Sequence, residues 1–262
     1  MNRPLRHRSG VAVALVAIAT GAEAAEIPAA ERRSDYELMA PELRRMQDDD
    51  SANPGMLWVL DGEAEWQRKD GSAGKSCADC HGEAARSMKG VATRYPTFDQ
   101  RLGRPIDLEG RINDCRTRHQ GAELLPIESK ELLSLTAYVT RQSQGLPISV
   151  GDDAATLPFV TAGQAIFQQR QGQLNLSCAQ CHDDNWGQRL AGAVIPQAHP
   201  TGYPLYRLEW QSLGSLPRQL RNCLTGMRAA PYSYGAPEMI ELELFLGRRA
   251  RGLTLETPAV RP

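Results

Sequence analysis

The chain contains the pentapeptide CADCH at residues 77–81 and a second copy, CAQCH, at residues 178–182. Two cysteines at this spacing can form thioether bonds with the two vinyl groups of a haem, and the adjacent histidine then binds the iron as its proximal ligand. One copy alone would also suit half of a zinc site or a redox dithiol. Two copies in a six-cysteine chain with an export signal favour haem, and predict a dihaem c-type cytochrome. The attachment and ligand residues are Cys77, Cys80 and His81 for the first haem, and Cys178, Cys181 and His182 for the second.

The N-terminus has the pattern of a cleaved export signal, and covalent haem attachment takes place outside the bacterial cytoplasm. Basic residues precede a short apolar run at 11–22, and residues 22–24 have the small-x-small form of a cleavage site. The run is too short for a membrane-spanning helix. We therefore expect a signal peptide at 1–24 and a soluble periplasmic protein that begins near Ala25.

The charge balance argues against two classes of partner. The chain has 30 basic and 31 acidic residues; removal of residues 1–24 takes away three arginines and Glu23, which leaves 27 basic and 30 acidic residues. A mildly acidic chain of this kind is not expected to bind nucleic acid or a membrane surface. The remaining 238 residues are enough for two domains of ordinary size.

Similar segments accompany both pentapeptides. They are GEAEW (62–66) and GQAIF (163–167), NDC (113–115) and RNC (221–223), and GLPI (145–148) and GLTL (252–255). The first pair has the same offset of 101 residues as the pentapeptides. Each half is therefore expected to contain a helix, a haem motif, a loop, a cysteine and a second helix.

These patterns predict a mainly α protein with two cytochrome c-like domains that are related by an internal repeat and have long loops. We place an N-terminal extension at 25–56, the first domain at 57–150 and the second at 151–262. The boundary lies in a segment of linker composition, 147–158. The extension is expected either to dock a partner or to be a solvated arm that wraps on its own domain.

Four helices are predicted from apolar spacing and capping residues. Residues 129–144 have apolar side chains near helical spacing and a Gly-Leu-Pro stop, and Pro237 suits the first turn of a matching helix. Thr161 is a candidate cap for a helix toward Gln171. Residues 36–46 form a candidate amphipathic helix in the extension.

Two cysteines are not used by the pentapeptides, and they occupy equivalent places in the two halves. Cys115 and Cys223 are expected either to form a disulfide with each other or to bind, as thiolates, the iron of their own half. Four residues further on, His119 and Met227 would share a helix face with these cysteines, and both are common axial ligands. The residues alone leave these alternatives open.

The segment around Cys223 resembles a known family. LEWQSLGSL (208–216), RQLRNC (218–223) and TGMRA (225–229) are similar to the signature of SoxA, the dihaem subunit of the SoxAX cytochrome of periplasmic sulfur oxidation. The resemblance extends from about Tyr36 to the C-terminus and includes Cys115. The haem motifs are common to many cytochromes c, whereas the stretch around Cys223 is more specific.

The resemblance implies an enzyme, an L-cysteine S-thiosulfotransferase. It would join thiosulfate oxidatively to a cysteine of the SoxYZ carrier, forming an S-thiosulfonate and passing two electrons to haem. It would pair with SoxX, a small monohaem cytochrome. In this family, the counterparts of Cys115 and Cys223 are both haem ligands, and the counterpart of Cys223 is also the catalytic residue and carries an extra sulfur as a persulfide.

Thiosulfate is a dianion, so its site needs fixed positive charge. The arginines that flank Cys223 are Arg218, Arg221 and Arg228. A guanidinium group suits oxyanions, although at least one of these arginines is expected to bind a haem propionate instead. The family's substrate-binding arginine lies four residues before the active cysteine, and that position is Gln219 here.

Two other functions are compatible with the same motifs. A dihaem thiosulfate dehydrogenase would couple two thiosulfates into tetrathionate without a carrier protein. A plain electron-transfer cytochrome would use His/Met ligation and would have no substrate.

Overall fold

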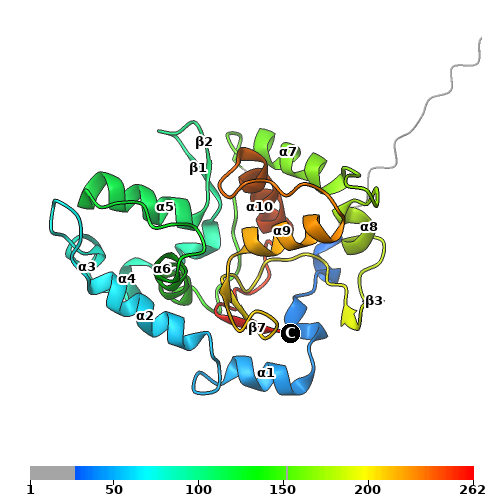
Figure 1. The fold of residues 1–262 in the computed structure, drawn as a ribbon, viewed down its shortest axis with the longest axis horizontal. Coiled ribbons are helices and arrows are strands. Elements are labelled where there is room, and N and C mark those ends of the chain that lie inside the picture. Colours follow the sequence, from blue (N-terminus) through cyan, green and yellow to red (C-terminus); the bar gives the residue numbers. More distant parts are fainter. Residues whose placement is uncertain (1–26, 152) are drawn as a thin grey trace, which may run out of the picture.

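The computed structural model describes residues 27–151 and 153–262, so the predicted signal peptide and the predicted start of the mature chain lie outside the described residues. The described chain is mainly helical and repeats one helix-pair arrangement in its two halves (Figure 1). The first half has α2 (Met56–Gln67), α3 (Cys77–His81), α4 (Ala84–Ser87), β1 (Thr97–Asp99), β2 (Arg104–Ile106), α5 (Leu108–Cys115) and α6 (Lys130–Arg141).

The second half has counterparts of α2, α3, α5 and α6 in the same order, no counterpart of α4, and more strands. Its elements are α7 (Leu157–Gln168), α8 (Cys178–His182), β3 (Arg189–Leu190), β4 (Ala193–Val194), β5 (Leu205–Arg207), β6 (Ser212–Gly214), α9 (Leu216–Gly226), α10 (Pro237–Arg249) and β7 (Ala259–Arg261). β5 is the central strand of a three-stranded sheet, antiparallel to β6 and parallel to β7.

The sequence repeat reflects one helix crossing that is used twice. α2 packs on α6, and α7 packs on α10. A Cβ added at Gly62 would lie 2.0 Å from the carbonyl oxygen of Ser134, and one added at Gly163 would lie 2.0 Å from that of Glu241. Each helix pair therefore approaches so closely that only glycine fits at the crossing.

The repeated GLPI and GLTL segments pair with each other. The main chains of Leu146 and Ile148 bond to those of Leu255 and Leu253, respectively, and the bonds from Ile148 N to Leu253 O and from Leu255 N to Leu146 O are both 2.9 Å long. Ile148 and Val150 are buried in one cluster with residues of α7 and α10. The beginning of the predicted linker is thus part of a core shared by both halves.

Two of the predicted helices are confirmed by the structure. α6 begins after Ser129, whose side chain accepts a hydrogen bond from Leu132 N, and α10 begins at Pro237. The prediction for Thr161 is wrong, because α7 already begins at Leu157 and Thr161 Oγ1 donates to the Leu157 carbonyl inside it. The side chain of Asp153 accepts the N–H groups just before α7 and so sets the earlier start.

The prediction of one continuous helix at 36–46 is also wrong, because the segment forms two separate helices. The structure has a short 3₁₀ helix, Asp35–Leu38, followed by α1 (Pro41–Asp48). Ala40 is extended, with ψ 147°. The residue before a proline is sterically disfavoured in the helical region, so Pro41 starts a new helix instead of continuing an old one.

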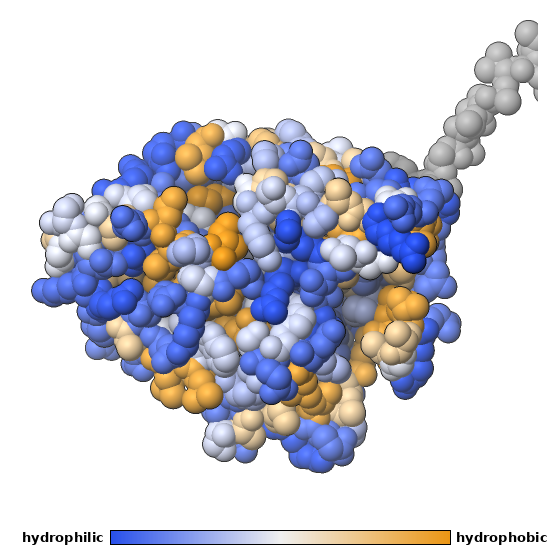
Figure 2. Space-filling model, in the orientation of Figure 1, coloured by the Kyte–Doolittle hydropathy of each residue, from blue (hydrophilic) through white to orange (hydrophobic). Residues whose placement is uncertain are grey.

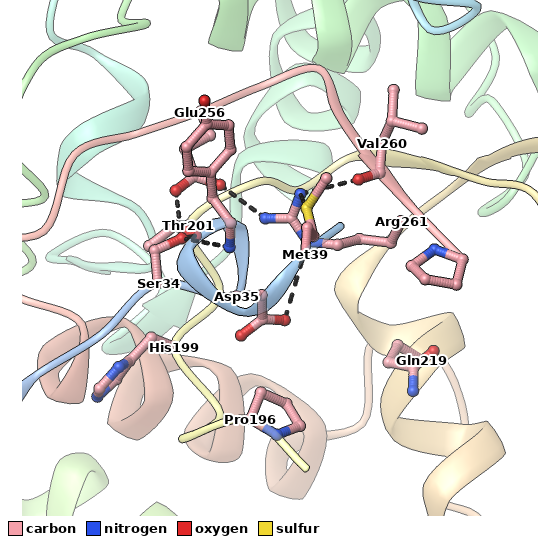
Figure 3. Close-up of polar contacts among 12 residues, drawn as sticks. Ser34, Asp35, Met39, Pro196, His199, Thr201, Gln219, Glu256, Val260 and Arg261 are labelled. Atoms are coloured by element: carbon pink, nitrogen blue, oxygen red, sulfur yellow. Dashed lines mark hydrogen bonds and ion pairs between the residues drawn. The ribbon is translucent and has the colours of Figure 1, made fainter. Parts of the chain in front are cut away.

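The N-terminal segment 27–55 packs mainly on the second half, and it also contacts the first domain where Arg141 pairs with Asp50 at 2.7 Å. α1 lies against β7, Gln47 Oε1 accepts from Val260 N at 3.0 Å, and Asn53 Nδ2 donates to Pro258 O at 2.9 Å. Figure 3 shows Arg261 among Asp35, Met39 and Glu256. The segment is therefore packed against its own chain, with Met39, Gln47 and Asn53 buried, and most of these contacts are with the second half.

The surface is mixed in character. The face drawn in Figure 2 is mostly hydrophilic and carries separate apolar patches. Across the described ranges 27–151 and 153–262, no helix is both long enough and apolar enough to span a membrane.

Candidate functional site

The two pentapeptides form equivalent short helices, α3 and α8. Ser76 and Asp79 cap α3 reciprocally, each side chain bonding the backbone N–H of the other, and Ser177 and Gln180 do the same for α8. The first cysteine of each motif follows its cap directly. Both pairs of thiols are thus presented from one helical turn, as attachment to a haem requires.

The two motif histidines each lie next to an aromatic ring from the preceding helix. The ring centroids of His81 and Trp66 are 5.8 Å apart, and those of His182 and Phe167 are 6.4 Å apart. Trp66 and Phe167 are the last residues of the GEAEW and GQAIF segments, so the repeat places equivalent rings beside equivalent histidines.

The orientation of His182 is fixed by a main-chain hydrogen bond. Its Nδ1 lies 2.7 Å from the carbonyl oxygen of Pro196, so Nδ1 carries the proton. Burial lowers the pKa of His182, which keeps the ring neutral. Nε2 is then the free, unprotonated nitrogen that an iron ligand must present, and the site fits a haem.

The two remaining cysteines are free thiols and do not form a disulfide. Burial raises the pKa of Cys178, and the nearby Cys223 raises it further. In the first half, burial raises the pKa of Cys77 to about 11, Arg116 opposes this, and the nearby Cys115 adds to it. Each remaining cysteine therefore lies near the haem motif of its own half and suits a ligand role there.

The competing ligands His119 and Met227 are placed differently from each other. His119 is exposed in a π-helical turn, Arg116–Gln120, so the α-helical alignment predicted with Cys115 does not apply. Met227 is buried at the C-cap of α9, and its N–H bonds the carbonyl of Cys223.

Cys223 lies in α9, a helix that Ser215 caps by accepting a hydrogen bond from Arg218 N. Burial raises the pKa of the Cys223 thiol, while a hydrogen bond from Gln219 and the charge of Arg207 oppose this increase. Gln219 Nε2 donates to Cys223 Sγ at 3.5 Å. The site thus combines a half-buried sulfur with polar groups on one side.

Arg207 is a site residue that the sequence reasoning missed. It is the last residue of β5, and its Nη1 donates to Gln219 Oε1. Arg207 lies 16 positions before Cys223, so it does not flank the cysteine in sequence. Its only sequence signal is its position directly before the LEWQSLGSL segment.

The three predicted substrate arginines have other partners or positions. The guanidinium of Arg218 lies 4.2 Å from the centroid of the Trp210 ring, and its Nη1 is 3.7 Å from Glu128. Arg221 lies 4.6 Å from the Tyr234 ring and donates to the carbonyl of Tyr232. Arg228 is exposed just beyond α9, with a positive φ of 56°.

Comparison with known proteins gives matches across both halves. The family model "SoxA/TsdA, cytochrome c domain" matches residues 61–148 and 162–255. The L-cysteine S-thiosulfotransferase subunit SoxA of Pseudaminobacter salicylatoxidans is 37% identical over 235 residues, which cover 89% of this chain and 82% of that protein. The subunit of the same name from Rhodovulum sulfidophilum is 33% identical over 231 residues, 88% of this chain and 80% of its own length.

A solved structure has the same fold. The structure described as SoxXA from P. pantotrophus superposes with a TM-score of 0.85 at 30% identity, covering 88% of this chain and 87% of that chain. The two predicted cytochrome c domains are thereby confirmed. This chain belongs to the SoxA family of c-type cytochromes, whose cytochrome c domains carry covalently attached haem c.

Proposed function

We propose that this protein is the catalytic subunit of an L-cysteine S-thiosulfotransferase, with Cys223 as its catalytic residue. The observation that carries the proposal is the place of Cys223: a half-buried thiol on α9, next to the haem motif of its half and hydrogen-bonded by Gln219. The names of the relatives support the same activity.

The proposed reaction joins thiosulfate to a cysteine thiol of a SoxYZ-type carrier protein. Carrier–SH and S₂O₃²⁻ give carrier–S–S–SO₃⁻, one proton and two electrons. One sulfur–sulfur bond forms and one S–H bond breaks. The two electrons leave one at a time, and haem, when bound, is the group that accepts them.

Two haem c groups are proposed, one in each half. Cys77, Cys80, Cys178 and Cys181 would attach them, His81 and Cys115 would bind the iron of the first, and His182 and Cys223 that of the second. We retain the domain division at 57–150 and 151–262 as part of this proposal. Cys223 would serve as ligand and as reactive sulfur, carrying an additional sulfur as a persulfide, because sulfur–sulfur exchange proceeds by attack of a deprotonated sulfur.

The proposed partners and location follow from the same family. The matched structure is described as SoxXA, which supports a SoxX-like monohaem cytochrome as the second subunit. The carrier is a protein substrate whose cysteine must reach Cys223. The predicted signal peptide at 1–24 would direct the chain to the periplasm.

The test is a product assay with and without the carrier. Oxidised complex is mixed with thiosulfate, and mass spectrometry follows both the carrier cysteine and free tetrathionate. The proposal predicts a thiosulfonate adduct on the carrier and little tetrathionate. Tetrathionate formed equally without the carrier would instead indicate a thiosulfate dehydrogenase, and haem reduction with neither product would indicate a plain electron-transfer cytochrome.

A further inference from the structure

We propose that Arg207, at the end of β5, supplies the fixed positive charge that binds the thiosulfate dianion beside Cys223. This inference rests on the proposed function of Cys223. It assigns thiosulfate binding to a strand residue, because the guanidinium groups of Arg218 and Arg221 on α9 already have other partners.

The first argument is a continuous polar path from Arg207 to the sulfur. Arg207 Nη1 donates to Gln219 Oε1, and Gln219 Nε2 donates to Cys223 Sγ at 3.5 Å. The amide orientation is determined by its neighbours, since only the oxygen of Gln219 can accept from a guanidinium. The glutamine thus connects the charge of Arg207 to the reactive sulfur; Gln219 itself extends from α9 (Figure 3).

The second argument is the set of donors that Arg207 keeps. Nε donates to the main-chain oxygen of Pro262 at 2.9 Å, and the guanidinium lies 5.3 Å from the centroid of the Trp210 ring. These contacts hold the group in place. Within the described part of the chain, Nη2 donates to no protein atom, and no aspartate or glutamate side chain forms an ion pair with Arg207.

The third argument is the contrast with the two arginines on α9, Arg218 and Arg221. Arg218 is ion-paired with Glu128 and stacks on the Trp210 ring, and its Nη1 also donates to Ser212 Oγ at 3.3 Å. Arg221 donates to the Tyr232 carbonyl. A guanidinium with an unused N–H and no ion pair to an aspartate or glutamate side chain is the better receptor for a small oxyanion, because charge-assisted hydrogen bonds to that N–H need not displace such an ion pair.

The test compares thiosulfate binding and turnover in the holo complex carrying Arg207→Ala with those in the wild type. We expect the Kd for thiosulfate, measured by titration without carrier, to rise by about ten- to a hundredfold, as for loss of a charged hydrogen bond. KM for thiosulfate should rise similarly, with a smaller change in kcat. Arg45→Ala, which alters an exposed arginine of α1, is the control and should leave both constants unchanged.

A second variant separates binding from folding. In Arg207→Ala/Gln219→Arg the charge is returned on α9, one helical turn from Cys223, and thiosulfate affinity should recover. If Arg207 only stabilised the sheet, Arg207→Ala would lower the thermal midpoint, while the Kd of the folded, haem-loaded protein for thiosulfate would stay unchanged. Covalent haem content and the thermal midpoint of each variant identify any misfolded protein.

The outcomes distinguish this inference from the proposed function. A wild-type complex that forms no carrier adduct overturns the proposed function. A wild type that forms the adduct, with unchanged Kd and KM in Arg207→Ala, overturns the role of Arg207. The same follows if Arg218→Ala, and not Arg207→Ala, produces the loss of affinity.

Discussion

The two halves of this molecule use the same scaffold and differ in the charges around their extra cysteine. Next to Cys115, the basic side chains are already paired: Asp114 contacts Arg101 at 2.5 Å, Arg111 at 3.4 Å and Arg118 at 3.5 Å. Next to Cys223, Arg207 has no acidic side-chain partner in the described part of the chain, and Gln219 connects it to the sulfur. The difference shows how a repeated domain can gain an anion site through local charge without a change of fold.

The second half is also more firmly held around its histidine. His182 bonds the Pro196 carbonyl, the neighbouring Asp183 pairs with the buried Arg249, and Arg249 Nε donates to the Gln197 carbonyl at 3.0 Å. The N-terminal segment adds a further layer, since Arg33 N donates to Gln197 Oε1 at 2.7 Å. Such outer contacts fix the orientation of a metal-binding histidine.

The largest expected effect comes from replacing each of the two remaining cysteines, Cys223 and Cys115, with alanine. Cys223→Ala should lower carrier-dependent turnover by about a thousandfold or more, because it removes the reacting sulfur. Cys115→Ala should change turnover only a few-fold, by roughly the amount expected from an altered haem ligand. Each variant keeps its attachment cysteines and histidine, so covalent haem content is the control. Equal losses in both variants would remove the distinction between the halves.

The next effect tests whether the two helix crossings are equivalent. Gly62→Ala and Gly163→Ala should each lower the free energy of unfolding by about 1–3 kcal/mol, because the new methyl group meets a carbonyl oxygen. Denaturant unfolding measures this, with Gly226→Ala as control, since a Cβ there has no atom within 4 Å. If either crossing accepted alanine without loss, the close approach of that helix pair would be disproved.

The third prediction concerns the N-terminal segment. Gln197→Ala removes bonds from Arg33 N at 2.7 Å and to Glu31 O at 3.1 Å and should cost about 1–3 kcal/mol, mainly in the second half. Hydrogen exchange at 29–38 should become faster. Gln142→Ala removes one bond to Tyr138 O in the first half and serves as the matched control. Unchanged exchange at 29–38 would show that other contacts hold the segment.

The smallest effect is a pH dependence in the same segment. Burial raises the pKa of Asp35 from 3.8 to about 6, against an opposing effect of Arg261. The folded state therefore takes up a proton between these pH values, so this contribution to stability is present below pH 3.8 and is lost as pH rises through 6. Asp35→Asn should flatten this part of the dependence of the thermal midpoint on pH, and an unchanged slope would show that Asp35 is not its source.

Local patterns in the sequence predicted the parts of the fold that depend on local physics. The apolar spacing and Gly-Leu-Pro stop of residues 129–144 and the position of Pro237 predicted α6 and α10, whereas the short helices α3 and α8 at the pentapeptides were not predicted. The start of α7 was missed because Asp153, not Thr161, arranges the first turn. The placement of the N-terminal segment depends on contacts with residues about 200 positions away, such as Asn53 with Pro258, which no local pattern reveals.

The candidate site was only partly predictable for the same reason. Cys223 was found through its neighbours in sequence, which lie on one helix. Arg207 and Gln219 are 12 positions apart and meet only through the fold, and the partners that occupy Arg218 come from residues 128 and 210. Charge near a residue in sequence is therefore a weak guide to the charge available to a ligand.

The most direct test of the central claim is high-resolution mass spectrometry of the purified complex, with peptide mapping across Cys223 and Cys115. The account predicts an additional sulfur on the Cys223 peptide and none on the Cys115 peptide. An unmodified Cys223, or an additional sulfur on Cys115 instead, would contradict the assignment of the catalytic centre to the second half.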